Sequence, residues 1–374
     1  MQIGNVIYKN DISGDLDNVI GENYANKSAL IVISNFGKKS FLNSITNILV
    51  KYNISYKCFN VAGTKFVSKQ LMQENESLLR QKFDFVVGVG GGSASDVSKM
   101  FADALRCKSY FVSTILSSLS PFNSNILICD DENCYFQNSH FHTKIFVDKN
   151  LFASMKYNKF LDCQKFLFSL INCVDELAFF DDVFSKNNNQ IYSQCQNEII
   201  SIFNEINNVC LEDEKRKIFF QRFICFAQTF SCLDFSKCSA FYLAAYFAQK
   251  NNDSYVNCFQ MSAFILCSAM TAFFSIKNFV GINLNTSKID FDLLERQIIL
   301  SQNDIFFKKL NAIKCKFLKV FCQEKNLHKY FISNNYTVYA ITCEDVFLQV
   351  RKYIENNYCN GFCLIVLKNL GMFN

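Results

Sequence analysis

A glycine run at the end of an apolar segment is the stretch of this sequence with the clearest chemical meaning. Phe83–Lys99 reads FDFVVGVGGGSASDVSK, and its apolar run Phe83–Val89 leads directly into Gly90–Gly92. The run predicts a buried strand, and Ser93 with Asp96 three residues later has the spacing of a capping box at a helix start. Glycines admit a ligand close to the backbone, and a helix N-terminus favours negative charge, so the stretch predicts a phosphate-binding turn. The alternative is a tight strand–helix turn that binds no ligand.

The elements around this turn alternate between strand and helix patterns over the first 150 residues. Such alternation with short links predicts a parallel sheet covered on both faces, with ligands at the carboxyl ends of the strands. The expected strands are Ala29–Ser34, Tyr56–Val61, Phe83–Val89, Ser109–Ser113, Asn125–Cys129 and Lys144–Val147. The expected helices are Lys39–Tyr52, Val67–Lys82 and Ala94–Cys107.

The pattern changes near Asn150, after which long segments have helical spacing. The expected helices of this half are Lys159–Phe180, Ile191–Val209, Glu214–Ser231, Ser239–Gln249 and Val256–Lys277. We therefore expect two domains, an α/β domain over residues 1–150 and an all-helical domain over residues 151–374.

Charge and cysteine content argue against several classes of protein. The 374 residues carry a net charge of +5 without a long basic run, so neither nucleic acid nor a membrane surface is an expected partner. The 18 cysteines lie mostly inside apolar runs, and the N-terminus lacks the pattern of a signal peptide. These features predict reduced thiols and a cytoplasmic protein.

The segment GGGS-x-x-D-x-x-K at Gly90–Lys99 does not have the ordinary dinucleotide spacing GxGxxG. It resembles the signature of the superfamily of iron-containing alcohol dehydrogenases, glycerol dehydrogenases and 3-dehydroquinate synthases. Further segments resemble the same superfamily, namely Ser113–Ser118 (STILSS), Asn125–Asp131 (NILICDD), Lys144–Asp148 (KIFVD) and the chain end Cys359–Phe373. Glycerol dehydrogenase and glycerol-1-phosphate dehydrogenase form the most similar branch.

The resemblance implies an NAD(P)-binding α/β domain, an all-α domain that binds metal in relatives, and an active site between them. It also implies which residues bind the dinucleotide. These are Gly90, Gly91, Gly92 and Ser93 at the pyrophosphate, Asp96 and Lys99 at the fixed polar positions, Thr114 and Ser117 on the nicotinamide side, and Asn35 near the adenine ribose. Asn35 lacks the negative charge that often holds this ribose, so NAD and NADP both stay open.

The metal half of the family pattern is missing from the sequence. In the family, an Asp and two His hold a divalent metal that lowers the pKa of the alcohol. The three ligand positions map to Gln164, Tyr242 and Asn257, and a substrate-side Asp maps to Leu119. Amide oxygens and a phenol are poor ligands for zinc or iron. We therefore expect neither metal at these positions.

Two functional hypotheses follow. The first is a divergent NAD(P)-dependent dehydrogenase of a small polyol or polyol phosphate, with Lys99 and Tyr242 as proton-handling candidates. The second is a non-catalytic pseudoenzyme, a nucleotide-binding or scaffold subunit. The resemblance to this family, whose helical domains often pair, implies a homodimer in either case.

Histidines occur at three positions, His140, His142 and His328. His140-x-His142 lies in a polar segment before a predicted strand. It is interpreted either as a relocated metal pair or, preferably, as part of a solvated surface loop. His328 is expected at the surface.

Overall fold

The structure is a computed structural model of the chain. It describes residues 2–61, 66–129, 134–156, 189–206 and 213–233, with scattered positions between 159 and 177 and between 235 and 262. The chain divides into two compact units, Met1–Leu167 with Asn197–Ser236, and Phe168–Gln196 with Lys237–Asn374. The domain boundary expected near residue 150 stays a prediction.

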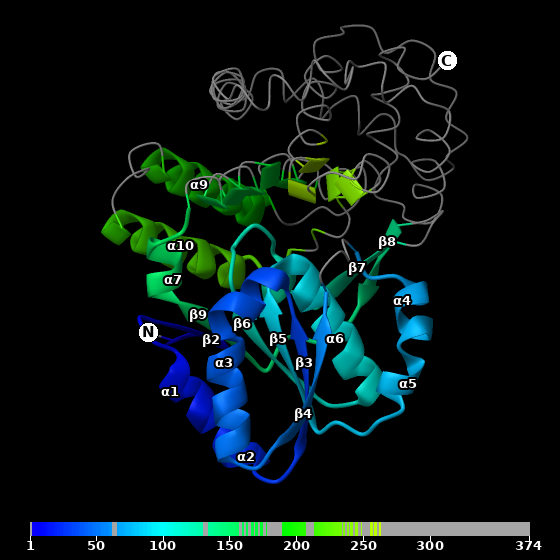
Figure 1. Cartoon of the computed structure of the whole chain (residues 1–374). Helices are drawn as coiled ribbons and strands as arrows, with labels where there is room; N and C mark the ends of the chain where they lie inside the picture. Colours follow the sequence, from blue (N-terminus) through cyan, green and yellow to red (C-terminus); the bar gives the residue numbers. More distant parts are fainter. Residues whose placement is uncertain are drawn as a thin grey trace, which may run out of the picture. The chain divides into compact units, whose positions relative to one another are not determined.

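A seven-stranded sheet forms the centre of the first unit (Figure 1). Its order is β1-β2-β9-β6-β5-β3-β4, and every neighbouring pair is parallel except β1 with β2. The strands are β1 Gln2–Ile3, β2 Val6–Lys9, β3 Ser28–Ile33, β4 Ser55–Asn60, β5 Phe85–Gly90, β6 Lys108–Ser113 and β9 Lys144–Asp148. The predicted α/β class with a parallel sheet is confirmed.

Helices cover both faces of this sheet. The helices that follow the first strands are α1 Ser13–Leu16, η1 Asp17–Gly21, α2 Glu22–Tyr24, α3 Asn35–Lys51, α4 Lys69–Glu74, α5 Glu76–Leu79 and α6 Gly92–Leu105. On one face, Ile31, Phe85 and Val87 share a core with Ile45 of α3. On the other face α6 packs over Gly88, where a Cβ would collide with the Ser98 side chain. Burial on both faces explains why the central strands β3 and β5 have continuous apolar sequences.

Two later helices pack on the edge of the sheet that carries β2 and β9. These are α7 Lys149–Ala153 and α10 Asp213–Thr229. The Tyr8 hydroxyl donates to the Lys217 carbonyl at 2.7 Å, and the Arg216 guanidinium donates to the carbonyls of Ala153 and Met155 at 3.2 and 2.9 Å. Residues about 200 positions apart are thereby joined within one unit.

Two local predictions need correction. Asn125–Cys129 is a strand (β7) as predicted, but it is not part of the parallel sheet and pairs antiparallel with β8 (Cys134–Asn138) in a separate hairpin. The single helix expected over Val67–Lys82 is two short helices, α4 and α5. The strands β1 and β2 were not predicted, because the apolar segment VIYK is very short.

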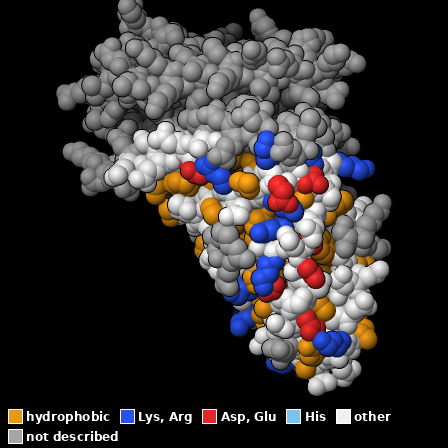
Figure 2. All heavy atoms as spheres, turned by 90° about the vertical axis from the view of Figure 1, so that its left-hand side faces the viewer, with side chains coloured by type: hydrophobic (Ala, Val, Ile, Leu, Met, Phe, Trp, Pro, Cys, Tyr) orange, Lys and Arg blue, Asp and Glu red, His pale blue; other side chains and the backbone are white. Residues whose placement is uncertain are grey.

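The helical predictions for the second half are confirmed where the structure describes it. The helices are α9 Asn189–Ile206 and α10. Predicted helices beyond residue 237 fall largely outside the described residues. In the described part, no helix is long and apolar enough to span a membrane. On the face drawn in Figure 2, basic side chains are interspersed with acidic ones.

Candidate dinucleotide site

The glycine turn lies where the order of the sheet changes direction. From β3 the chain moves outward to β4, returns to β5 on the other side of β3, and continues to β6 and β9. Ligands of open α/β sheets bind at the carboxyl ends of the strands at such a switch point. The carboxyl end of β5 is Gly90, and α6 begins two residues later at Gly92. The predicted phosphate turn therefore occupies the switch point.

Close packing explains the glycines at this turn. A Cβ on Gly90 would lie 2.7 Å from the Ala94 Cβ and 2.8 Å from the Ser34 hydroxyl oxygen, and Gly90 has a φ of +156°. A Cβ on Gly92 would lie 2.8 Å from the Ser118 hydroxyl oxygen. Real Cβ atoms avoid such contacts, so the first turn of α6 can sit this close to its neighbours only with glycine.

The start of α6 differs from the sequence prediction. The N-cap residue is Gly91, so Ser93 is already the second helical residue and the proposed capping box was wrong. Gly91 has no side chain that could accept from the first N–H groups of α6. A helix N-terminus of this kind binds anions through those groups and the helix dipole. Gly91 and Gly92 are partly exposed, which fits a diphosphate approaching the backbone.

The neighbouring helix α3 begins at the same end of the sheet. Its N-cap Ser34 accepts from the Gly37 N–H at 3.1 Å. Asn35 is exposed, and its side-chain oxygen accepts from the Asn60 amide at 3.3 Å. Asn35 is the first residue of α3 and Asn60 the last residue of β4, so both amides lie at the carboxyl end of the sheet, where the ribose of a dinucleotide is expected. They offer hydrogen bonds and no charge, so the choice between NAD and NADP stays open.

Asp96 and Lys99, which the sequence assigns to the cofactor, face the segment after β6. The Lys99 ammonium is fully buried and donates to the carbonyls of Ser120 and Asn125 at 3.0 and 2.5 Å. Asp96 accepts from the Ser120 hydroxyl and from the Leu127 N–H. Its carboxylate lies 3.4 Å from the Lys99 ammonium.

Burial opposes both charges of this pair. Desolvation raises the pKa of Asp96 and lowers that of Lys99, while each charge shifts the other in the opposite direction. Carbonyl oxygens and a carboxylate around an ammonium compensate such desolvation. The contacts therefore make Lys99 and Asp96 an anchor between α6 and the Ser120–Leu127 segment.

The remaining nicotinamide-side residues lie beside the turn. The Thr114 N–H donates to the Gly90 carbonyl at 2.9 Å, and Thr114 is 4% exposed. Ser117 is partly exposed. The Ser120 hydroxyl contacts the Gly92 carbonyl at 3.3 Å. The structure thus brings Thr114 and the segment after it against the glycine turn, and their contact with a cofactor stays a prediction.

The three positions that correspond to the family's metal ligands lie outside the described residues. They are Gln164, Tyr242 and Asn257. Asp162, two residues from Gln164, is described, and its carboxylate pairs with the Lys159 ammonium at 3.1 Å. Among the residues that the structure describes, no group of three His, Cys, Asp or Glu could hold a metal ion.

Sequence reasoning missed a buried hydrogen-bonded chain behind the turn. His142 is 1% exposed, so the preferred interpretation of a solvated loop was wrong for this residue. Its Nε2 lies 2.9 Å from the Ser95 hydroxyl oxygen, and its Nδ1 lies 2.9 Å from the Ser109 hydroxyl oxygen. The same Ser109 oxygen lies 2.9 Å from Nε2 of His140, whose Nδ1 contacts Asp103.

The contacts of this chain connect Asp103 to the start of α6. The Asp103 carboxylate contacts Nδ1 of His140, and the Ser109 hydroxyl bridges Nε2 of His140 and Nδ1 of His142. The Ser95 hydroxyl completes the chain at Nε2 of His142. Burial lowers the pKa of His142 well below its ordinary value, and Lys99 and His140 act in the same direction. A neutral His142 thus joins the start of α6 to β6.

Comparison with known proteins assigns the family of this region. Residues 4–152 match the family model described as iron-containing alcohol dehydrogenase. These residues belong to the iron-containing alcohol dehydrogenase superfamily. The matched range contains the glycine turn, its switch point and the buried chain behind it. The resemblance predicted from the glycine signature is therefore confirmed.

Solved structures of the superfamily share the fold. An iron-containing alcohol dehydrogenase from Thermotoga maritima is 17% identical, with a TM-score of 0.60 over 84% of each chain. The NADH-dependent butanol dehydrogenase A from Thermotoga maritima is 14% identical, with a TM-score of 0.58 over 96% of this chain and 93% of its own. A glycerol dehydrogenase from Schizosaccharomyces pombe is 13% identical, with a TM-score of 0.52 over 72% of this chain and 73% of its own. At these identities the likeness establishes the fold alone.

One curated relative matches a shorter segment. It is the mitochondrial hydroxyacid-oxoacid transhydrogenase of Xenopus tropicalis, which is 27% identical over 99 residues. That segment is 26% of this chain, and the chain spans only 21% of the relative's length.

Proposed function

We propose that this chain is an NAD(P)-dependent oxidoreductase that acts on an alcohol carbon, with the dinucleotide diphosphate at the N-terminus of α6. One observation carries the proposal: α6, N-capped by Gly91, begins at the switch point of a parallel sheet. The superfamily of residues 4–152 supports an oxidoreductase function.

The residues of the turn would bind and orient the dinucleotide. The backbone of Gly91, Gly92 and Ser93 offers N–H donors to the diphosphate, and Asn35 is placed for the ribose. A bound dinucleotide supplies the hydride acceptor. In the balanced reaction the alcohol carbon gives a hydride to the nicotinamide and the hydroxyl gives up a proton, which leaves a carbonyl product.

Lys99 is better placed for positioning than for proton transfer. Its ammonium donates to backbone carbonyls of the segment that lies against the turn, and it is fully buried. We assign to Lys99 and Asp96 the task of holding that segment in place. Tyr242, the other proton-handling candidate, lies outside the described residues.

The test is a titration of the full-length protein with NADH and with NADPH, followed by nucleotide fluorescence and calorimetry. We expect one site per chain with a dissociation constant in the micromolar range, and oxidation of an alcohol with NAD(P)⁺ under the same conditions. Absence of binding for both nucleotides would contradict the proposal.

A second candidate function is a nucleotide-binding pseudoenzyme or scaffold subunit. It is favoured by the sequence, which has Gln164, Tyr242 and Asn257 at the family's metal-ligand positions. Elemental analysis of the purified protein distinguishes the two candidates when it is combined with the activity assay. Nucleotide binding without metal and without turnover supports the pseudoenzyme, whereas stoichiometric zinc or iron with turnover excludes it.

A further inference from the structure

Two cysteines lie opposite each other at one end of the β7–β8 hairpin. In its antiparallel register Asn125 faces Asn138 and Cys129 faces Cys134. The sequence DDEN separates the two cysteines, and Cys129 is 4% exposed. An opposed pair can be joined by a disulfide only if its Cβ atoms come within about 3.5–4.5 Å of each other. The hydrogen bonds around the pair show whether the strands allow this.

Antiparallel strands alternate between two kinds of opposed pair. In a hydrogen-bonded pair the N–H and C=O groups point at the partner strand, and the Cα atoms are about 5.5 Å apart. In a non-hydrogen-bonded pair these groups point away from the partner strand, and the Cα atoms are only about 4.5 Å apart. The second kind has the closer Cβ atoms, so it is the kind that suits a disulfide.

Cys129 and Cys134 form a non-hydrogen-bonded pair. The Cys129 N–H donates to the Val67 carbonyl at 2.8 Å, so it points away from β8. Two residues earlier the Leu127 N–H also points away from β8 and donates to the Asp96 carboxylate at 3.4 Å. Both bonds are those of residues whose own N–H groups take no part in the β7–β8 ladder.

The other end of the hairpin gives the same result. The Ser139 N–H donates to the Ser124 carbonyl at 2.6 Å, so this opposed pair is hydrogen-bonded. Because the two kinds alternate along the strand, the pairs at Asn125, Leu127 and Cys129 are all non-hydrogen-bonded. The two ends of the hairpin therefore agree on the kind of pair that the cysteines form.

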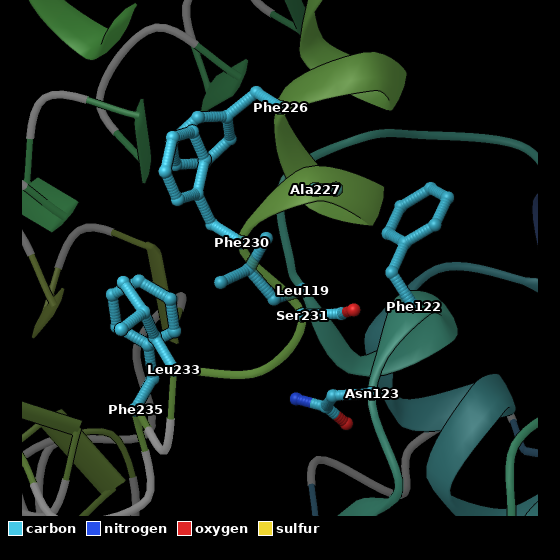
Figure 3. A pocket seen from close by; sticks show the side chains of 9 residues that line it. All are labelled: Leu119, Phe122, Asn123, Phe226, Ala227, Phe230, Ser231, Leu233 and Phe235. Carbon is cyan, nitrogen blue, oxygen red and sulfur yellow. The ribbon is translucent and has the colours of Figure 1, made fainter. Parts of the chain in front are cut away.

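Contacts on both strands hold this register in place. Just before β7, Phe122 lines a small pocket together with the end of α10 (Figure 3). At the start of β7, the Asn125 carbonyl accepts from the Lys99 ammonium at 2.5 Å. On β8, the Lys69 ammonium lies 5.5 Å from the centroid of the Tyr135 ring. A slip by one residue would break these contacts, so the two cysteines stay opposed.

We propose that Cys129 and Cys134 are a modification site, at which a peroxide forms an intrachain disulfide across the hairpin. The Cys134 thiolate attacks the O–O bond of hydrogen peroxide, which gives a sulfenic acid and hydroxide. The Cys129 sulfur then attacks the sulfenic sulfur, and the hydroxyl leaves as water with the Cys129 proton. In total two thiols and one hydrogen peroxide give one disulfide and two water molecules. Cys129 takes the second step because its burial shields it from the oxidant.

This site is separate from the proposed dinucleotide turn, and its effect is on the hairpin. Strand β7 carries the Asn125 carbonyl and the Leu127 N–H, which are partners of Lys99 and Asp96. A disulfide at the far end of β7 slows the opening of this strand from β8. In a compartment that keeps thiols reduced, such a bond is a reversible mark of oxidation and no permanent part of the fold.

Peptide mapping of the oxidised full-length protein tests the proposal. The reduced protein is treated with hydrogen peroxide, blocked with N-ethylmaleimide and digested with trypsin. The tryptic peptide Ser109–Lys144 contains Cys129 and Cys134 and no other cysteine. We expect it to be lighter by two hydrogen atoms, to carry no maleimide, and to regain both thiols in dithiothreitol. Two maleimides on this peptide, at a dose that oxidises the exposed Cys58 and Cys232, would overturn the proposal.

Introduced pairs test whether the kind of pair decides the reaction. In a chain that lacks the native pair, Asn125→Cys with Asn138→Cys creates a second non-hydrogen-bonded pair in the same tryptic peptide. Ile126→Cys with Gln137→Cys creates a hydrogen-bonded pair beside it. We expect the first pair to lose two hydrogen atoms and the second to keep both thiols at the same dose. Equal oxidation of the two pairs would contradict the geometric argument.

Hydrogen exchange measures what the modification does to the hairpin. We expect the backbone amides of β7 and β8 to exchange about tenfold more slowly in the oxidised protein than in the reduced protein. Cys134→Ser should abolish this difference, whereas Cys232→Ser, at an exposed position, should preserve it. Equal exchange in the oxidised and reduced wild-type protein would show that no bond joins the two strands.

Discussion

The first turn of α6 and the buried residues that follow it satisfy their polar groups in different ways. Gly91 and Gly92 are partly exposed and present backbone N–H groups at a helix start. A few residues on, the side chains of Asp96 and Lys99 are buried, and their partners belong to the protein itself. A sequence signature that resembles one cofactor motif therefore contains a glycine part that is open to solvent and an anchoring part that is buried.

This difference predicts that the two parts can be perturbed separately. Changes in the anchoring part should lower the free energy of unfolding. Changes in the glycine part should leave the free energy of unfolding nearly unchanged and lower the affinity for the dinucleotide.

Removal of the buried ammonium should have the largest effect. Lys99→Met leaves the Asp96 carboxylate and the Ser120 and Asn125 carbonyls without their donor, so we expect the free energy of unfolding to fall by about 3–5 kcal/mol. Urea denaturation followed by circular dichroism measures it. Lys108→Met, at an exposed strand position, is the control and should stay within about 0.5 kcal/mol. A loss below about 1 kcal/mol in Lys99→Met would show that the buried Lys99–Asp96 pair contributes little to the free energy of unfolding. Adding Asp96→Asn to Lys99→Met should restore part of the loss.

Replacement of the buried His142 should cause the second largest loss of stability. His142→Phe keeps the stacking on Phe111 (ring centroids 4.9 Å apart) but leaves the Ser95 and Ser109 hydroxyls without this partner. We expect a loss of about 2–3 kcal/mol in the same denaturation experiment. His140→Phe is the comparison, and because His140 is partly exposed its loss should be smaller. The reverse order would contradict the inferred chain of hydrogen bonds.

The same imidazole should make the stability of the protein depend on pH. The pKa of His142 is lowered in the folded protein, so below about pH 6.5 the unfolded chain takes up a proton that the folded one does not. Stability should therefore fall as the pH drops below 6.5, by up to about 1.4 kcal/mol per pH unit. The measured quantity is the difference between the wild-type protein and His142→Gln from pH 7 to pH 5, in which other groups such as Asp96 cancel. A difference independent of pH would mean that the pKa of His142 is the same in the folded and unfolded states.

A methyl group in the glycine part should change stability least. In Gly91→Ala the new Cβ would lie 2.8 Å from the Cγ2 methyl of the partly exposed Ile115, which must shift to make room, so we expect about 1 kcal/mol of destabilisation. The affinity for NADH should fall by about tenfold, because the methyl group stands between the diphosphate and the backbone. Gly14→Ala, where nothing lies within 4 Å, is the control. Unchanged NADH affinity in Gly91→Ala would place the nucleotide elsewhere.

The sequence predicted the parts of the fold that depend on local patterns. The apolar runs of β3, β5 and β6 and the glycine turn were found because continuous burial and missing side chains are visible in the sequence. The partners of Lys99 were not found, since its acceptors are backbone carbonyls 21 and 26 residues away that no pattern marks. His142 lies in a polar segment, NSHFHT, and only the fold brings Ser95 and Ser109 to it.

The packing of α10 against the sheet has a consequence for biosynthesis. The Tyr8 hydroxyl finds its partner on Lys217, and the carbonyls of Ala153 and Met155 find theirs on Arg216. The helix α10, which carries both partners, begins at Asp213, 60 residues after Ala153, the last residue of α7. At about 5–20 residues per second, a ribosome needs roughly 3–12 s to make that stretch. During this interval Tyr8 of β2 lacks its acceptor on α10, and the apolar side chains of Leu119 and Phe122 lack the cover that α10 gives them. A nascent chain arrested before α10 should therefore be a good client for an Hsp70-type chaperone, and one extended past α10 a poor one.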